Sequence, residues 1–230
     1  MLTRPSYRLP IRFDVAKLRA DLALVDGTDW RPHFHKEDFS GEWSGLALRS
    51  LSGRVDDLFA HPGDPDDYRP TPLLEQCPSL QQVIAELGLQ WRGVRLLSLG
   101  AGSRILPHRD RGLAYRFGEL RLHIPILTGD AVEFVVAGER VVMAPGECWY
   151  CDFDREHSVV NSGSERRVHL VLDAPRDARS DELLADARMP PVTEFDAMDE
   201  DTQRRVAAQL QQRGDDTSLR LAAAILASLS

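Results

Sequence analysis

The chain has few cysteines, no excess of positive charge and no long apolar run, and each of these absences excludes a class of protein. Its cysteines, Cys77, Cys148 and Cys151, do not suggest a disulfide scaffold and fit a reducing cytosol. The net charge of −8 argues against a nucleic-acid partner, because phosphate binding needs a basic face. No segment is apolar enough to span a bilayer, and residues 1–18 lack the apolar stretch of a secretory signal. We therefore expect a cytoplasmic protein without membrane or nucleic-acid partners.

The length and composition fit an ordinary globular domain. The 230 residues suffice for one domain with a full core and a small helical appendage, and 43% hydrophobic and 28% charged residues are typical contents. Before residue 90 the pattern is mixed. Apolar residues at helical spacing predict helices over 13–25 and 79–88, and alternation predicts a strand over 45–51. A loop rich in Pro, Gly and Asp is expected over 61–72.

The middle of the chain, from Gln90 to Asp173, is rich in predicted strands. Short apolar runs alternate with tight-turn sequences such as LTGDA and APGE, which is typical of the antiparallel strands of a sandwich or barrel. A double-layer jelly roll satisfies this pattern while leaving a mouth for a ligand. We therefore predict a mainly β protein with a jelly-roll (double-stranded β-helix, cupin-like) core. The expected strands are 92–100, 118–128, 131–136, 139–144, 147–152, 156–161 and 165–173.

The composition changes after residue 174, and the rest of the chain is expected to be helical. The sequence predicts a jelly-roll domain over 1–175, with its helical and strand lead-in, and a helical extension over 176–230. The last helix is rich in Ala and Leu and could pack against the barrel or a partner subunit, which leaves a homodimer as one alternative. The expected helices are 180–188, 199–213 and 217–229.

Four polar residues in the strand-rich region suggest a metal site. His108 and Asp110 form a His-x-Asp pair, and His157 and Arg167 follow further along the chain. Side chains at i and i+2 of an extended segment point the same way, so the first pair can face one metal, whereas His157 must arrive from another strand. Two imidazoles and one carboxylate make the facial triad of non-haem Fe(II) oxygenases. An Arg beside such a triad suits a dicarboxylate co-substrate, because its planar fork can grip a carboxylate in two places.

The turn sequence at residues 161–164 predicts how the last two of these residues meet. In a hairpin, residues equally far from the centre of the turn lie directly opposite each other, and His157 and Arg167 meet this condition to within one position. We therefore expect the two side chains to be cross-strand neighbours.

Two predicted strands each carry an Arg-x-His face that is backed by an aliphatic face. Arg121 and His123 alternate with aliphatic residues in LRLHIPIL, and Arg167 and His169 do so in RVHLVLD. Arg and His rarely face a barrel interior unless they are paired or bind a ligand. These faces predict a polar cavity suited to an anion, although a structural salt-bridge face remains an alternative for Arg121 and His123.

The chain resembles a known family in four of its stretches. It is similar to the aspartyl/asparaginyl/proline hydroxylase family of Fe(II)- and 2-oxoglutarate-dependent oxygenases, and most of all to its bacterial proline hydroxylases. The resemblance is good over residues 90–175, weaker over 30–55, and implies a jelly-roll fold. The stretches are RLLSLGAGSRILPHRD, ELRLHIPI, GECWYCDFDREHS and RRVHLVLD.

The resemblance implies a role for each residue that matches a family position. Arg167 would bind the distal carboxylate of 2-oxoglutarate, and Arg121 and His123 fall on positions that help to hold the co-substrate in the aspartyl hydroxylase branch. That branch lacks the metal-binding carboxylate, so Asp110 sides with the hydroxylases of amino acids. The implied iron ligands are His108, Asp110 and His157.

The implied activity is hydroxylation of an unactivated C–H bond with O2, Fe(II) as the cofactor and 2-oxoglutarate as the co-substrate. A proline-like free amino acid is the favoured substrate. One alternative is an Asp, Asn or Pro residue in a peptide or on a carrier. Another is a cupin-like module that binds a metal or an anion without turnover.

Four further residues are candidates for contact with the substrate. Trp149 matches a family aromatic residue on the strand that leads to the distal His, and Arg116 lies in the loop 111–118, which could border the substrate. Trp43 and Arg49 could also contact it, but Trp43 could equally belong to the core and Arg49 to the solvated surface.

Two other motifs are weaker candidates for metal ligands. His33 and His35 could chelate a metal, but they have no carboxylate partner at fixed spacing, so a loop or substrate-side role is favoured. Cys148 and Cys151 form a C-x-x-C in a predicted strand, where i and i+3 point to opposite faces, and no second cysteine pair completes a zinc site.

Overall fold

The chain divides into two compact units, which are described separately. The first ends at Ala187, and the second begins at Arg188. The boundary falls later than the one predicted from composition, because helix α4 (Ala178–Asp186) buries Leu183 and Leu184 in the core of the first unit. The computed structural model describes residues 4–33, 37–59, 63–186, 199–214 and 216–227.

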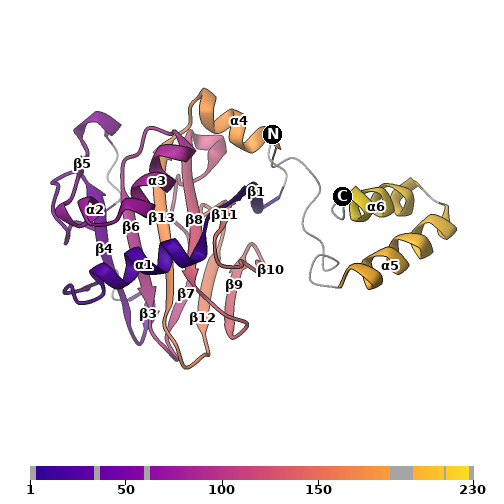
Figure 1. Ribbon diagram of the computed structural model, residues 1–230, viewed down its shortest axis with the longest axis horizontal. Coiled ribbons are helices and arrows are strands. Elements are labelled where there is room, and N and C mark those ends of the chain that lie inside the picture. Colours follow the sequence, from indigo (N-terminus) through magenta and orange to yellow (C-terminus); the bar gives the residue numbers. More distant parts are fainter. Residues whose placement is uncertain (1–3, 34–36, 60–62, 187–198, 215, 228–230) are drawn as a thin grey trace. The chain divides into compact units, whose positions relative to one another are not determined.

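Two antiparallel β-sheets form the first unit, as Figure 1 shows. The larger sheet contains, in spatial order, β1 (Ser6–Arg12), β11 (Glu147–Cys151), β8 (Glu119–Leu127), β13 (Arg167–Pro175), β6 (Val94–Leu99), β4 (Trp43–Ser50) and β2 (Arg31–Pro32), with β5 (Arg69–Pro70) paired to β4. The smaller sheet contains β10 (Glu139–Arg140), β9 (Val132–Val136), β12 (His157–Asn161), β7 (Arg104–His108) and β3 (Phe39–Ser40).

The path of the chain between the sheets is that of a jelly roll. From β6 to β13 the chain passes repeatedly from one sheet to the other, so neighbouring strands in each sheet are distant in sequence. This alternation confirms the predicted mainly β, double-stranded β-helix core. Of the predicted strand 139–144, only Glu139 and Arg140 pair in a sheet.

Helices cover the outer face of the larger sheet (Figure 1). The apolar faces of α1 (Val15–Val25) and α3 (Pro78–Leu87) share one core with the aliphatic faces of β8 and β13, and the short α2 (Pro72–Glu75) adds to it. These are the aliphatic faces predicted behind each Arg-x-His face. Side chains of this core that are fully buried include Leu18, Leu80, Leu122, Ile124 and Leu170.

Local signals explain where these helices begin and end. The Asp14 carboxylate accepts hydrogen bonds from the backbone N–H groups of Ala16 and Lys17 and so caps α1. Helix α3 starts at Pro78, whose missing N–H costs nothing in a first turn. It ends at Gly88, which has a φ of 65° in the left-handed region that glycine tolerates.

A second core lies on the faces that the two sheets turn toward each other. It is built mainly from aromatic and β-branched side chains of both sheets, including Trp43, Ile105, Phe134 and Val159. The inner faces of β8 and β13 are polar instead, as the sequence predicted. Polar residues on an otherwise closed interface mark the place where a ligand site is to be sought.

The hairpin predicted around residues 161–164 does not form. β12 pairs with β7 and β9 in the smaller sheet, and β13 pairs with β6 and β8 in the larger one. His157 therefore lies opposite His108 and Val136, not opposite Arg167. Residues 161–164 do form a short connection, but such a connection can also carry the chain from one sheet to the other. The Asn161 amide supports this crossing by donating to the carbonyls of Leu99, Gly100 and Glu165.

The second unit is a pair of helices, α5 (Glu200–Arg213) and α6 (Asp216–Ala227). They pack through small and aliphatic residues, among them Ala207, Ala222 and Ile225. Asp199 caps α5 through a hydrogen bond from Thr202 N, and Gly214 follows it with a φ of 70°. Among the described residues, no helix combines the length and the apolar character that crossing a membrane requires.

Candidate active site

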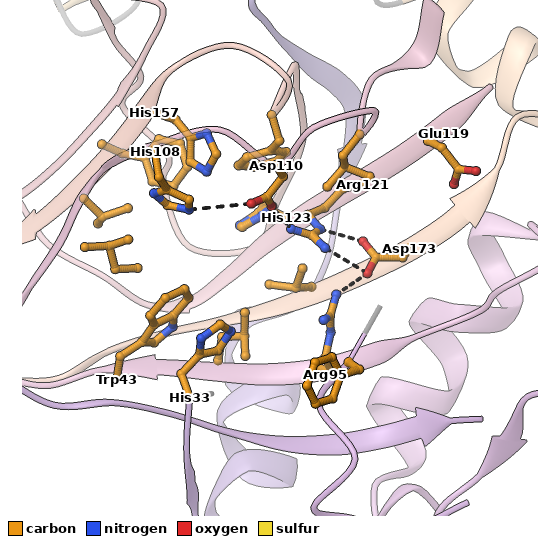
Figure 2. A pocket seen from close by; sticks show the side chains of 18 of the residues that line it. His33, Trp43, Arg95, His108, Asp110, Glu119, Arg121, His123, His157 and Asp173 are labelled. Carbon is orange, nitrogen blue, oxygen red and sulfur yellow. Dashed lines mark hydrogen bonds and ion pairs between the residues drawn. The ribbon is translucent and has the colours of Figure 1, made fainter. Parts of the chain in front are cut away.

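A cavity of about 550 Å³ opens between polar and aromatic side chains of both sheets (Figure 2). One wall carries charged residues of the larger sheet, the opposite wall carries two histidines of the smaller sheet, and aromatic and aliphatic groups fill the rest. Its lining includes His33, Trp43, Phe59, Arg92, Arg95, Leu97, Ile105, His108, Asp110, Leu113, Glu119, Arg121, His123, Phe134, Phe153, His157, Val159, Arg167, Val171 and Asp173.

Three residues of the smaller sheet and its adjoining segment converge on one point of the cavity. His108 ends β7, His157 begins β12, and the two are direct partners in the antiparallel pairing, with ring centroids 4.2 Å apart. Asp110 follows His108 by two residues, and its backbone N–H donates to Phe153 O at 2.9 Å. One ligand atom from each of the three residues lies within 4.8 Å of the others. The structure thus brings the predicted triad together from two neighbouring strands.

The two imidazoles present the same nitrogen to this point. His108 Nδ1 lies 2.8 Å from Leu106 O, and His157 Nδ1 lies 3.0 Å from Arg155 O. A carbonyl can only accept, so each Nδ1 carries a proton, and in the neutral ring Nε2 then keeps the lone pair. Burial lowers the pKa of His157 to about 4, which keeps this ring neutral near pH 7. Neutral imidazoles oriented by a second hydrogen bond are the usual nitrogen ligands of a divalent metal.

The Asp110 carboxylate is ionised and held from one side. Burial opposes its ionisation, but the charge of Arg121 outweighs burial and lowers the pKa of Asp110. Arg121 Nη1 donates to Asp110 Oδ2 at 2.6 Å. The other oxygen, Oδ1, lies 3.6 Å from His108 Nε2 (Figure 2). Two nitrogens and one carboxylate oxygen on one side of a point, with the cavity on the other, fit an iron of the facial-triad type.

Arg121 belongs to a chain of ion pairs on the wall of the larger sheet, which are partly buried at Asp110 and buried at Arg95. Its Nε and Nη2 donate to the two oxygens of Asp173 at 2.6 and 3.1 Å. The guanidinium of Arg95 also contacts Asp173 and donates through Nη1 to Leu58 O at 2.8 Å. In space, the ion pairs therefore connect Asp110, Arg121, Asp173 and Arg95 in this order, so that anions and cations alternate (Figure 2).

Arg167 is a buried cation without an anion. Its side chain is 2% exposed, lines the cavity, and donates through Nη2 to His169 Nδ1 at 2.7 Å. Its Nε has no hydrogen-bond partner, and among the residues that the structure describes it forms no ion pair with a carboxylate. Burial lowers the pKa of Arg167 to about 9. A guanidinium in this state is an attachment point for an anionic ligand.

His123 lines the same cavity as Arg167, and it too has a buried nitrogen without a hydrogen-bond partner. Burial, followed by the charge of Arg167, lowers its pKa well below the usual range, so the ring is neutral. Its Nδ1 lies 3.3 Å from His169 Nδ1, and its Nε2 is buried without a partner. Because His169 Nδ1 already accepts from Arg167, His123 Nδ1 is the donor in this contact, and Nε2 of the neutral ring can only accept a hydrogen bond. The unused guanidinium is therefore the group on this wall that suits a carboxylate.

The four candidate substrate residues are placed differently. Trp43 lines the cavity, where its ring stacks on His33 with centroids 3.4 Å apart. Trp149 lies in the core between the sheets and donates to Glu147 Oε2 at 2.9 Å. Trp149 does not belong to the cavity lining, and neither do Arg49 and Arg116. The imidazole of His33 faces the cavity, whereas His35 lies outside the described residues.

The two arginines of that set have other partners. Arg49 donates to the carbonyls of Trp91 and Pro65 at 2.9 and 3.0 Å. Arg116 pairs with the carboxylates of Asp152 and Asp154. Both therefore support loops around the sheets and do not border the cavity.

Several charged residues of the cavity were not predicted from the sequence. Asp173 stands at even spacing from Arg167 and His169 on the same strand, so the alternation that marked those two also pointed to it. Arg95 and Glu119 stand on β6 and β8 in the same way. Their charge could have drawn attention, but only the pairing of the strands shows that they share a wall.

The C-x-x-C motif of β11 forms no site. Cys148 belongs to the core under the helices and Cys151 to the core between the sheets, which confirms that they point to opposite faces. Burial raises the pKa of both thiols, which leaves them protonated and poor metal ligands.

The chain is similar in sequence to a family of hydroxylases. A family model described as aspartyl/asparaginyl beta-hydroxylase matches residues 13–177. An L-proline cis-4-hydroxylase of Rhizobium meliloti (strain 1021) is 26% identical over 188 residues, which cover 80% of this chain and 65% of that protein. An L-proline cis-3-hydroxylase 2 of a Streptomyces species is 26% identical over 191 residues, which cover 78% of this chain and 63% of that protein. The chain thus matches somewhat less than two thirds of the length of these relatives.

A solved structure gives the same result for the fold. An oxidoreductase of the 2OG-Fe(II) oxygenase family from Burkholderia pseudomallei superposes with a TM-score of 0.51 at 18% identity. The match covers 75% of this chain and 89% of that one. At this identity the likeness concerns the fold.

Proposed function

The chain belongs to the aspartyl/asparaginyl β-hydroxylase family, and from this premise we propose that it is an Fe(II)- and 2-oxoglutarate-dependent hydroxylase of an amino acid. The two relatives are named as proline hydroxylases, so a proline-like free amino acid is the proposed substrate and O2 the oxidant. Iron would be held by His108, Asp110 and His157.

The observation that carries the proposal is the buried, unpaired guanidinium of Arg167 in the same cavity as the triad. A metal-binding module without turnover needs the triad alone. A co-substrate with a carboxylate at each end would use both features, one end at the metal and the other at Arg167.

Each group of the chain has a defined task in this proposal. The bound iron and 2-oxoglutarate would supply the oxidising chemistry, in which O2 yields succinate, CO2 and a hydroxylated substrate. Arg167 would orient 2-oxoglutarate through its distal carboxylate, and Arg121 would keep Asp110 ionised. The aromatic groups Phe134 and Phe153 line the cavity and limit the access of water.

The cavity favours a small substrate over a segment of a folded protein. Its volume of about 550 Å³ lies in the range of small-molecule sites and must hold the co-substrate as well. The wall formed by His33 and Trp43 offers a flat aromatic surface for an aliphatic ring. A free amino acid with a compact side chain fits these dimensions.

The test is release of succinate by the purified 230-residue chain with Fe(II), ascorbate and 2-oxoglutarate. The free amino acids are screened with proline first, and a product 16 Da heavier than the substrate is sought by mass spectrometry. Succinate release that one amino acid stimulates, and that the His108→Ala variant abolishes, is expected. Metal binding without succinate formation for any amino acid would leave a binding module as the function.

A further inference from the structure

We propose that Asp173 is a positioning residue for the metal site and that it acts on the ligand Asp110 through Arg121. The proposal rests on the proposed function only in placing a divalent metal at the triad. It concerns how the carboxylate ligand is fixed, and it gives a role to a buried ion-pair chain that extends well away from the metal.

At the metal end of this series of ion pairs, the two oxygens of Asp110 have different neighbours. Arg121 Nη1 occupies Oδ2 at 2.6 Å, and Oδ1 is the oxygen on the side of His108. A carboxylate held in this way can offer one oxygen to a metal and cannot rotate to offer both. The position of the Arg121 guanidinium therefore sets the orientation of the ligand.

Asp173 is what sets the position of that guanidinium. The two residues are direct partners in the pairing of β13 with β8, and they form two hydrogen bonds, from Nε at 2.6 Å and from Nη2 at 3.1 Å. A two-point contact between planar groups fixes direction as well as distance. Asp173 is itself 5% exposed and is held on its far side by Arg95, which also donates to Leu58 O.

The charge of Asp173 matters for the metal as much as its geometry. Two guanidiniums, Arg121 and Arg95, lie on this wall of the cavity, and Asp173 is the anion that they share. Without it, Arg121 would keep Asp110 as its anion in the described structure and would compete with a divalent cation for that carboxylate. The uncompensated positive charge would also oppose the approach of the metal in a buried site. Geometry and charge thus predict the same direction, a weaker metal site.

A neighbouring ion pair offers a matched control. Glu119 stands two residues before Arg121 on β8, lines the same cavity, and pairs with Arg92 at 2.7 Å. Both of its carboxylate oxygens accept from Arg92 Nη1, at 2.9 and 2.7 Å, and among the described residues it forms no ion pair with Arg121 or Arg95. Neutralising Glu119 therefore removes one negative charge from the same wall without disturbing the orientation of Arg121.

The experiment measures metal binding by the metal-free 230-residue chain, without turnover. Co(II) is the probe, its dissociation constant is obtained by titration, and its visible absorption reports the ligand field. For Asp173→Asn we expect binding weaker by about 10- to 100-fold, the usual effect of losing a group that orients a metal ligand, together with a changed spectrum. For Glu119→Gln we expect a dissociation constant within about twofold of the wild type and an unchanged spectrum, since screening at a partly exposed pair limits its effect.

A double variant keeps the test decisive if Asp173→Asn fails to fold. Asp173→Asn combined with Arg95→Met removes both members of the distal pair, so no extra charge is left buried on that wall. Its metal binding should stay weaker than that of the wild type, because Arg121 still lacks its anchor although the net charge of the wall is restored.

The outcomes separate the two proposals. Wild-type affinity and spectrum in folded Asp173→Asn, or recovery of both in the double variant, would overturn the positioning role and leave the metal site standing. Failure of the wild-type chain to bind Co(II) more tightly than His108→Ala does would overturn the metal site and the positioning role together.

Discussion

Replacement of Arg167 by Met should weaken the binding of 2-oxoglutarate and leave the metal-free protein at least as stable as the wild type. Met keeps much of the length of the side chain and removes its charge. Arg166→Met is the matched control, because the neighbouring Arg166 pairs with Asp26 and lies over the ring of Trp30, outside the cavity. The same chemical change is thus made at adjacent positions that face different surroundings.

The size of the effect follows from the burial of Arg167. Its pKa falls from 12.5 to about 9, which corresponds to roughly 5 kcal/mol for holding the cation without an anion. A bound carboxylate can recover at most about that amount, and removal of one partner of a buried ion pair typically costs about 3–5 kcal/mol. The dissociation constant of 2-oxoglutarate should therefore rise by roughly 10²- to 10⁴-fold.

The effect on stability has the opposite sign. In the metal-free protein without ligand, Arg167→Met removes an uncompensated buried charge and keeps apolar contact with Phe134, so the free energy of unfolding should stay equal or rise by about 1–3 kcal/mol. Residues kept for a ligand at the expense of stability show this combination, whereas a structural arginine would lose stability on substitution.

Two measurements test whether Arg167 serves ligand binding or the stability of the fold. Calorimetric titration with 2-oxoglutarate in the presence of a redox-inert divalent metal gives the affinity, and urea unfolding without ligand gives the stability. The reasoning is refuted if Arg167→Met binds 2-oxoglutarate as tightly as Arg166→Met does, or if its unliganded form is several kcal/mol less stable than the wild type.

Three further outcomes are expected. Asp110→Ala should bind Co(II) at least about 100-fold more weakly than the wild type, since it removes a charged ligand; titration that shows equal affinity would exclude Asp110 from the metal site. The free energy of unfolding of the metal-free protein should fall as the pH drops from about 6.5 toward 4, by roughly 3 kcal/mol from His157 alone. The reason is that its folded-state pKa of about 4 lies below the 6.5 of an unperturbed ring, so the unfolded chain takes up the proton first; urea unfolding at pH 6.5 and 5 checks this, and a flat profile would contradict it. Gly146→Ala should destabilise the fold by at least about 2 kcal/mol more than Gly138→Ala, because both glycines have φ near +80° but only at Gly146 would a Cβ meet a backbone atom, Phe13 O at 2.4 Å. Thermal unfolding of the two variants provides the comparison, and equal losses would show that the contact is relieved.

Strand periodicity carried much of the fold prediction, and it failed where other rules set the structure. The strands of residues 118–128 and 165–173 were recognised because their Arg-x-His faces alternate with aliphatic residues, and both alternations are present in β8 and β13. β7 was not predicted as a strand, because its five residues include Pro107 and charged or polar ends that obscure any alternation.

The arrangement of strands was the part that local sequence could not specify. The turn at 161–164 was expected to close a hairpin, but β12 and β13 pair in different sheets. Residues joined by a short turn are close in either case, so turn sequence alone does not distinguish the two topologies. For the same reason the sequence located Arg121 but not Asp173 or Arg95, because Asp173 meets Arg121, and Arg95 meets Asp173, only through pairings of strands that are distant in sequence.

The two sheets carry the two ends of the site separately: the histidines stand on β7 and β12, and Arg167 stands on β13. The span between the two histidines and the guanidinium is consequently determined by how far apart the sheets pack. Under the proposed function, selection among diacids by length becomes a property of the β-scaffold. A diacid one methylene shorter or longer than 2-oxoglutarate could satisfy the metal or the guanidinium, but not both at once, without the sheets shifting against each other.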